Sequence, residues 1–83
     1  MGGLVSALNR KYRRQIQAGI FPLCYLCGEL IRHQNEVSQD HLICRSAGGR
    51  TVQENLSVTH KLCNNRRGSM TVQQWFDRQK ERV

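Results

Sequence analysis

The stretch "DHLICRSAGGRTVQENL", residues 40–56, places an acid beside a histidine and then runs through a glycine pair to an asparagine. Adjacent residues on a regular strand point to opposite faces of the sheet. Asp40 and His41 can therefore serve one site only if the strand that carries them ends or bends at this pair. The pair Gly48–Gly49 gives the loop after Asp40 and His41 enough conformational freedom for the chain to turn back. Apolar and polar residues alternate from residue 55 to 59, which predicts a second, half-buried strand.

Two short pairs of metal-ligating residues lie on either side of this stretch. "CYLC" separates Cys24 from Cys27 by two residues, and "HKLC" separates His60 from Cys63 by the same gap. Zn²⁺ takes thiolate and imidazole ligands tetrahedrally, and this gap lets both side chains of a tight turn reach one ion. A single CxxC also fits redox chemistry, but the alternating strands and helices of a thioredoxin-like fold are missing around it. The two pairs together predict a structural Cys3His zinc site.

On a helix that began at the second pair, consecutive side chains would point in different directions. Each residue of an α-helix turns the side chain by about 100°, so Cys63 can face the zinc while Asn64 faces the strands. Arg67 comes three positions after Asn64. It therefore lies on nearly the same side of the helix, where we expect it to reach a phosphate.

An amphipathic pattern predicts a basic N-terminal helix over residues 4–19. Its apolar stripe repeats at spacings of three, four and four residues. The stripe consists of Val5, Leu8, Tyr12 and Ile16. The basic residues off the stripe are Arg10, Lys11, Arg13 and Arg14. They fit either an arm that contacts phosphates or the solvated face of a packing helix.

A second flanking helix is predicted over residues 71–82. Thr71 and Gln74 have the spacing of a capping box, in which each side chain bonds the other residue's backbone amide. Val72, Trp75 and Phe76 share one side of this helix. We expect Trp75 to anchor the helix to the core rather than to stack on a base.

Size and charge narrow the class of protein. A chain of 83 residues is a single domain, residues 1–83, with too small a core to fold comfortably without a staple such as zinc. A net charge of +7 favours a polyanionic partner such as nucleic acid. No apolar segment suits a membrane span or a secretory signal. We therefore expect an intracellular protein.

The order CxxC, Asp-His, Gly-Gly, Asn-Leu and a second metal pair ending in Cys-Asn resembles the HNH endonuclease family, in particular its small phage-type members. The resemblance covers residues 24–68. Through its phage-type members it implies a location in the cytoplasm of a bacterial host. It implies a small α+β protein with a ββα-metal (His-Me finger) motif, in which two antiparallel strands and a helix are clamped by structural zinc. The predicted N- and C-terminal helices would be additions that flank this motif.

The resemblance also implies catalytic roles. His41 would be the general base that takes a proton from the attacking water, and neutral imidazole suits this role near neutral pH. Asp40 and Asn64 would hold a catalytic Mg²⁺ or Mn²⁺, for which carboxylate and amide oxygens are suitable ligands. Asn55 would hold the loop and orient His41.

Three positions depart from the family pattern. Asn64 stands at the third position, where histidine is frequent, so the chain is an HNN variant. Cys44 replaces a common proline and is expected to be a small, partly buried thiol. His60 stands where many relatives have cysteine; it suits zinc, although its place beside the catalytic helix also allows a catalytic role.

DNA is the expected substrate of an endonuclease or nickase. One site cuts one strand, so a double-strand break would need a dimer or two successive nicks. The basic residues expected near the site are Arg45, Arg50, Arg66 and Arg67. Phosphate contacts carry no base information, so low specificity, or a partner such as a phage packaging protein, is expected. The chain would act as a monomer or weak homodimer. The alternative is a zinc-stabilised DNA-binding module whose catalytic site has decayed.

Overall fold

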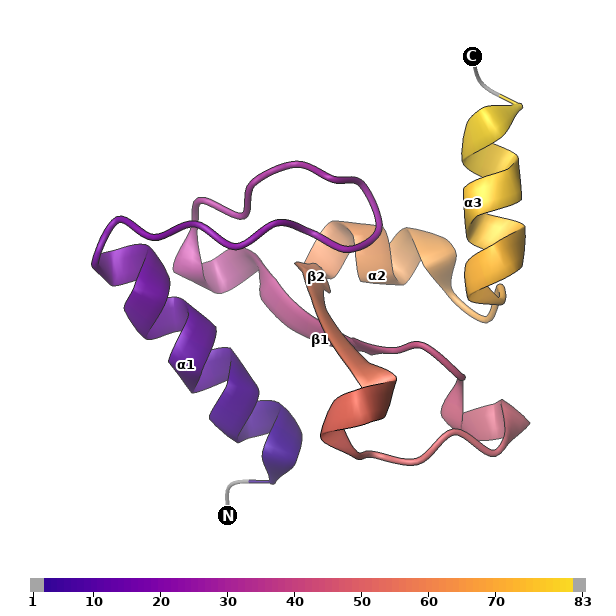
Figure 1. Cartoon of the computed structure of the whole chain (residues 1–83), viewed down its shortest axis with the longest axis horizontal. Coiled ribbons are helices and arrows are strands. Elements are labelled where there is room, and N and C mark those ends of the chain that lie inside the picture. Colours follow the sequence, from indigo (N-terminus) through magenta and orange to yellow (C-terminus); the bar gives the residue numbers. More distant parts are fainter. Residues whose placement is uncertain (1–2, 82–83) are drawn as a thin grey trace.

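The computed structural model describes residues 3–81 and shows a small α+β fold. The elements are α1 (Leu4–Gln17), β1 (Val37–His41), β2 (Leu56–His60), α2 (Lys61–Arg67) and α3 (Val72–Lys80), with single 3₁₀ turns at Gln34–Glu36, Arg45–Ala47 and Gln53–Asn55. The strands lie between α1 and the two later helices (Figure 1). The last helix was predicted to reach residue 82, which lies outside the described residues, but α3 already ends at Lys80 and Glu81 is its C-cap.

The N-terminal helix α1 is two residues shorter than the sequence pattern predicted. It ends at Gln17 because Gly19 takes a positive φ of 79°, and its amide bonds the carbonyl of Ile16 at 3.0 Å. Ile16 is buried and Tyr12 packs against the core, so the apolar stripe does face inward. The helix is thus a packing element that also presents basic residues to solvent.

The two strands form the predicted hairpin. They pair antiparallel, from Val37 opposite His60 to His41 opposite Leu56. Strand β1 ends at His41, as expected, and the chain bends at the two residues that follow. Asp40 and His41 are the last two residues of β1 that pair with β2, so the bend follows this pair directly.

Different helices cover the two faces of the hairpin. On one face, Gln39 donates to Asn9 of α1 at 3.3 Å. On the other, Ser38 accepts from Asn64 of α2 at 2.9 Å. Thr59, opposite Ser38 in the ladder, has no exposed surface, so the expected pattern, with Leu56 and Val58 alone turned inward on β2, is incomplete. The face beneath α2 is polar yet buried.

The loop between the strands depends on its glycines. Gly48 has a φ of 91°, which side chains rarely tolerate. A Cβ on Gly49 would lie 1.8 Å from the carbonyl oxygen of Ile43. The first glycine supplies the turn and the second the close approach of two backbone segments, so the loop can close on itself.

The C-terminal helix α3 is capped and docked as predicted. Thr71 and Gln74 form both halves of the capping box. Trp75 is 6% exposed and donates its indole N–H to the carbonyl of Leu26 at 2.8 Å. Phe76 meets Tyr25 edge to face at 5.8 Å. The tryptophan is therefore a core anchor.

Among the helices of residues 3–81, none has the length and apolar character of a membrane span.

Candidate metal centre and catalytic hairpin

Three cysteines and one histidine converge at the end of the hairpin. The ligand atoms of Cys24, Cys27, His60 and Cys63 all lie within 4.8 Å of one another. The Nδ1 atom of His60 is 3.4 Å from the sulfur of Cys27 and 3.8 Å from that of Cys63. Its Nε2 faces the carbonyl of Leu30 at 3.2 Å, and this contact leaves Nδ1 directed at the sulfurs. The set fits one tetrahedral zinc ion.

Local backbone structure brings the two halves of this centre together. The first half is a tight turn in which the Cys24 amide bonds the Glu29 carbonyl at 2.8 Å and the Gly28 amide bonds the Cys24 carbonyl at 2.9 Å. The second half uses His60, the last residue of β2, and Cys63 in the first turn of α2. The His60 amide also donates to the Cys24 sulfur at 3.3 Å. His60 therefore lies among the cysteines, which favours the zinc interpretation.

The surroundings of the three thiols differ. Burial, followed by the repulsion of Cys24, raises the pKa of the Cys63 thiol to about 12, and burial raises the pKa of Cys27. Burial also acts to raise the pKa of Cys24, but hydrogen bonds outweigh it, the largest from the His60 backbone, and the net pKa is lowered. The Cys24 thiol thus loses its proton more easily than the other two thiols, and three thiolates together need a cation to balance their charge. Zinc binds such thiols in their deprotonated form and so balances their charge.

The loop end of the hairpin holds the expected catalytic pair His41 and Asn55. The half-buried His41 shares a hydrogen bond of 2.9 Å between its Nε2 and the Thr51 hydroxyl. The Asn55 oxygen accepts from the Ile43 amide at 2.8 Å. Its nitrogen donates to the carbonyls of Ile43 at 3.1 Å and Arg50 at 2.9 Å. Asn55 therefore ties both sides of the loop together directly after the strand that carries His41.

Replacing Asn55 by alanine should loosen this loop without unfolding the protein. The variant loses three hydrogen bonds, at a cost of about 1–3 kcal/mol. Amide hydrogen exchange should show faster exchange at Ile43, whose donor loses its acceptor. Asn65→Ala, an exposed site on α2, is the control and should leave this amide protected. Unchanged exchange at Ile43 in Asn55→Ala would contradict the structural role.

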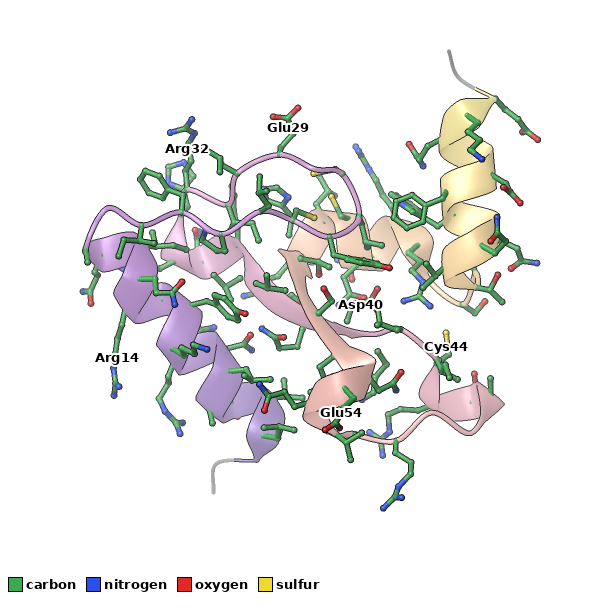
Figure 2. All side chains as sticks on the ribbon, in the orientation of Figure 1. Arg14, Glu29, Arg32, Asp40, Cys44 and Glu54 are labelled. Carbon is green, nitrogen blue, oxygen red and sulfur yellow. The ribbon has the colours of Figure 1, made fainter. Side chains whose placement is uncertain are left out.

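The two expected ligands of a catalytic cation lie on the α2 side of the hairpin. Asn64 donates from Nδ2 to the Ser38 hydroxyl at 2.9 Å and the Gln39 carbonyl at 3.3 Å, so Oδ1 is the atom of its amide suited to a cation. Asp40, two residues after Ser38, is buried and forms an ion pair with Arg67. In Figure 2 Asp40 lies near the centre of the molecule, against the hairpin.

A comparison with known protein families covers the segment that contains the Cys3His cluster and the hairpin. The family model for HNH endonucleases matches residues 24–80, more than half of the chain. The chain belongs to the HNH endonuclease family. The match extends beyond the motif residues into α3. No curated protein matches the sequence.

Arg67 differs from its expected place in this HNH domain. It was expected to contact phosphate, but it is 1% exposed. Helical spacing predicted correctly that it shares a side of α2 with Asn64, and that side faces β1 rather than solvent. Its burial removes it from the arginines that can meet DNA in this structure.

The other expected phosphate contacts lie at the surface. Arg45, Arg50 and Arg66 are exposed, on the loop and on α2. On α1, Arg10, Lys11 and Arg14 are exposed, and Arg14 extends away from the helix in Figure 2. Arg13 is half-buried, with its Nε donating to the Gln34 carbonyl at 3.4 Å. These side chains remain available to a polyanion.

Two residues that contact the expected site residues of the HNH hairpin were not predicted from the sequence. Thr51 bonds His41, and Ser38 bonds Asn64. Threonine and serine are common in strands and loops, and nothing in their spacing distinguishes these two. The one available signal was that Ser38 precedes Asp40 by two residues and so shares its strand face.

Proposed function

We propose that this chain is a metal-dependent DNA endonuclease that nicks one strand at a time. The observation that carries the proposal is the arrangement of His41, at the last position of a strand whose following loop is tied by Asn55. His41 acts as the general base that takes the proton of the attacking water. Thr51 holds the imidazole, and Asn55 keeps the loop closed beneath it.

Asp40 and Asn64 are the proposed ligands of Mg²⁺ or Mn²⁺. Their donor atoms are hard oxygens, which these cations prefer, and both residues lie at the interface of β1 with α2. When bound, the cation stabilises the charge that develops on the phosphate and the departing oxygen. Asn64 at the third position makes the site an HNN variant in which an amide replaces an imidazole. Zinc, by contrast, serves only to hold the fold.

The proposed DNA contacts are the basic side chains described above, which are exposed except for the half-buried Arg13. Arg45 and Arg50 belong to the loop that follows His41. They are therefore close in the chain to the proposed general base. Arg66 lies on α2, and α1 adds Arg10, Lys11, Arg13 and Arg14. Such contacts neutralise phosphates and position the strand. A net charge of +7 suits this role. We expect the protein to cut DNA with low sequence specificity.

Supercoiled plasmid tests the proposal. Zinc-loaded protein should convert it to the open-circular form when Mg²⁺ or Mn²⁺ is added and leave it supercoiled when neither is present. Asp40→Asn combined with Arg67→Met leaves no uncompensated buried charge. This double variant should reduce the rate strongly while gel-shift binding persists, because the exposed basic surface is intact. Binding without nicking under every cation would instead identify a non-catalytic DNA-binding module and would refute the proposed activity.

A further inference from the structure

The guanidinium of Arg67 is the most heavily bonded side chain of the hairpin interface. Nε donates to the Met70 carbonyl at 2.8 Å, one terminal nitrogen to Asp40 and to the His41 carbonyl at 2.7 Å, and the other to the Leu42 carbonyl at 2.9 Å. The second terminal nitrogen also lies 3.6 Å from the Cys44 sulfur. Arg67 therefore bonds the residue proposed to bind metal and the backbone of the proposed base.

Burial makes this ion pair strongly coupled. The Arg67 side chain is 1% exposed and that of Asp40 8% exposed. Two opposite charges removed from water this far need each other, since either one alone would be an uncompensated buried charge. The proposed ligand Asp40 therefore already has a cation. A divalent ion on the same carboxylate would lie beside a guanidinium with little water to screen their repulsion.

We propose that Arg67 is the resident counter-ion of Asp40 and that a divalent cation binds there only in competition with it. This inference rests on the proposed function, because it concerns the same cation site. The bonds of Arg67 to the three carbonyls of His41, Leu42 and Met70 need no carboxylate. The guanidinium can thus stay on the backbone while Asp40 turns to the cation. Arg67 is a positioning residue that holds the strand end and lowers the affinity for metal.

Mn²⁺ titration by calorimetry measures this competition in the zinc-loaded full chain. Arg67→Met should bind Mn²⁺ about tenfold more tightly than wild type, since a like charge at contact distance changes the affinity of such a site by about that factor or more. Arg66→Met is the matched control: it removes the same charge from the adjacent, exposed position of α2 and should change the affinity far less. Asp40→Asn combined with Arg67→Met should lose the gain.

A readout on wild type covers the case in which Arg67→Met does not fold. In ¹⁵N NMR, the Nε–H signal of Arg67 should shift with added Mg²⁺ along the same curve as the binding of the cation. Binding that leaves this signal unchanged would overturn the inference. So would equal effects of Arg66→Met and Arg67→Met, or absence of cation binding in both wild type and Arg67→Met.

The plasmid assay run in parallel separates the two proposals. Nicking by wild type together with an unmoved Arg67 signal would remove the counter-ion role and leave the nuclease proposal intact. A shifted signal and tighter binding by Arg67→Met, with no nicking under any cation, would support the counter-ion role and remove the nuclease activity.

Discussion

Zinc removal should unfold this protein. Cys24 and Cys63 are 1% and 8% exposed and belong to the hydrophobic core itself, so the metal centre and the core are one structure. Zinc in small domains contributes about 10–16 kcal/mol of apparent folding energy, and the net stability of a domain is only about 5–15 kcal/mol. Cys24→Ser, or a chelator, should therefore abolish the cooperative thermal transition followed by circular dichroism.

Cys44 provides the matched control for this prediction. It is the cysteine outside the cluster among those of the described residues, so Cys44→Ser should keep a transition close to that of wild type. Added zinc should restore the chelated wild type but not Cys24→Ser. An unchanged melting temperature for Cys24→Ser would show that the cluster does not support the fold.

The affinity of the Cys3His cluster for zinc should fall as the pH falls. Without a cation, burial raises the pKa of Cys63 to about 12 and raises that of Cys27, so zinc binding must release protons from these thiols. Proton release makes binding weaker as the pH falls. A fixed chelator concentration should accordingly unfold the protein more readily at pH 6 than at pH 8, because protonated thiols cannot bind zinc.

His41→Ala should abolish plasmid nicking while leaving the fold and DNA binding intact. Loss of a general base costs about 10²–10⁴ in rate. The side chain is half-buried at the end of β1, and its observed side-chain partner is the Thr51 hydroxyl. Truncation therefore removes little packing, and the melting temperature should change slightly. Initial rates of open-circle formation in saturating Mg²⁺ measure the effect.

His33 offers the control for the histidine substitution. It is exposed and precedes a 3₁₀ turn, away from the cluster and the catalytic loop in sequence. His33→Ala should nick at the wild-type rate. Equal rates for wild type and His41→Ala would remove His41 from the mechanism, whereas loss of DNA binding in His41→Ala would point to a contact rather than to catalysis.

Several features of the fold and site were predictable because they depend on residues close in the chain. The gaps within "CYLC" and "HKLC" bring each pair of ligands to one side of a short turn or helix start, and the structure brings the pairs together. The capping box of Thr71 and Gln74 is likewise complete within one helical turn. The alternation of polar and apolar residues predicted the second strand and the glycine pair predicted the loop, whereas the antiparallel hairpin was implied by the resemblance to HNH endonucleases.

The ends of helices and the contents of the interior were less predictable. Helix α1 stops at Gln17 because Gly19 adopts a left-handed conformation, a local event whose exact position the apolar stripe does not specify. Thr59 is fully buried although threonine is usual on a solvated face. Its burial depends on α2 lying over that face, and α2 is held there by Ser38 and Asn64, 26 residues apart.

Arg67 shows most clearly where the sequence alone was insufficient. Its helical position predicted which side of α2 it occupies, and that side was correct. Whether the side met solvent or β1 depended on a contact with Asp40, 27 residues earlier in the chain. Spacing along the chain is set by covalent geometry and can be read from the sequence. Burial and charge pairing arise only when distant segments pack, so the tertiary structure alone decided that this arginine holds Asp40 instead of facing solvent.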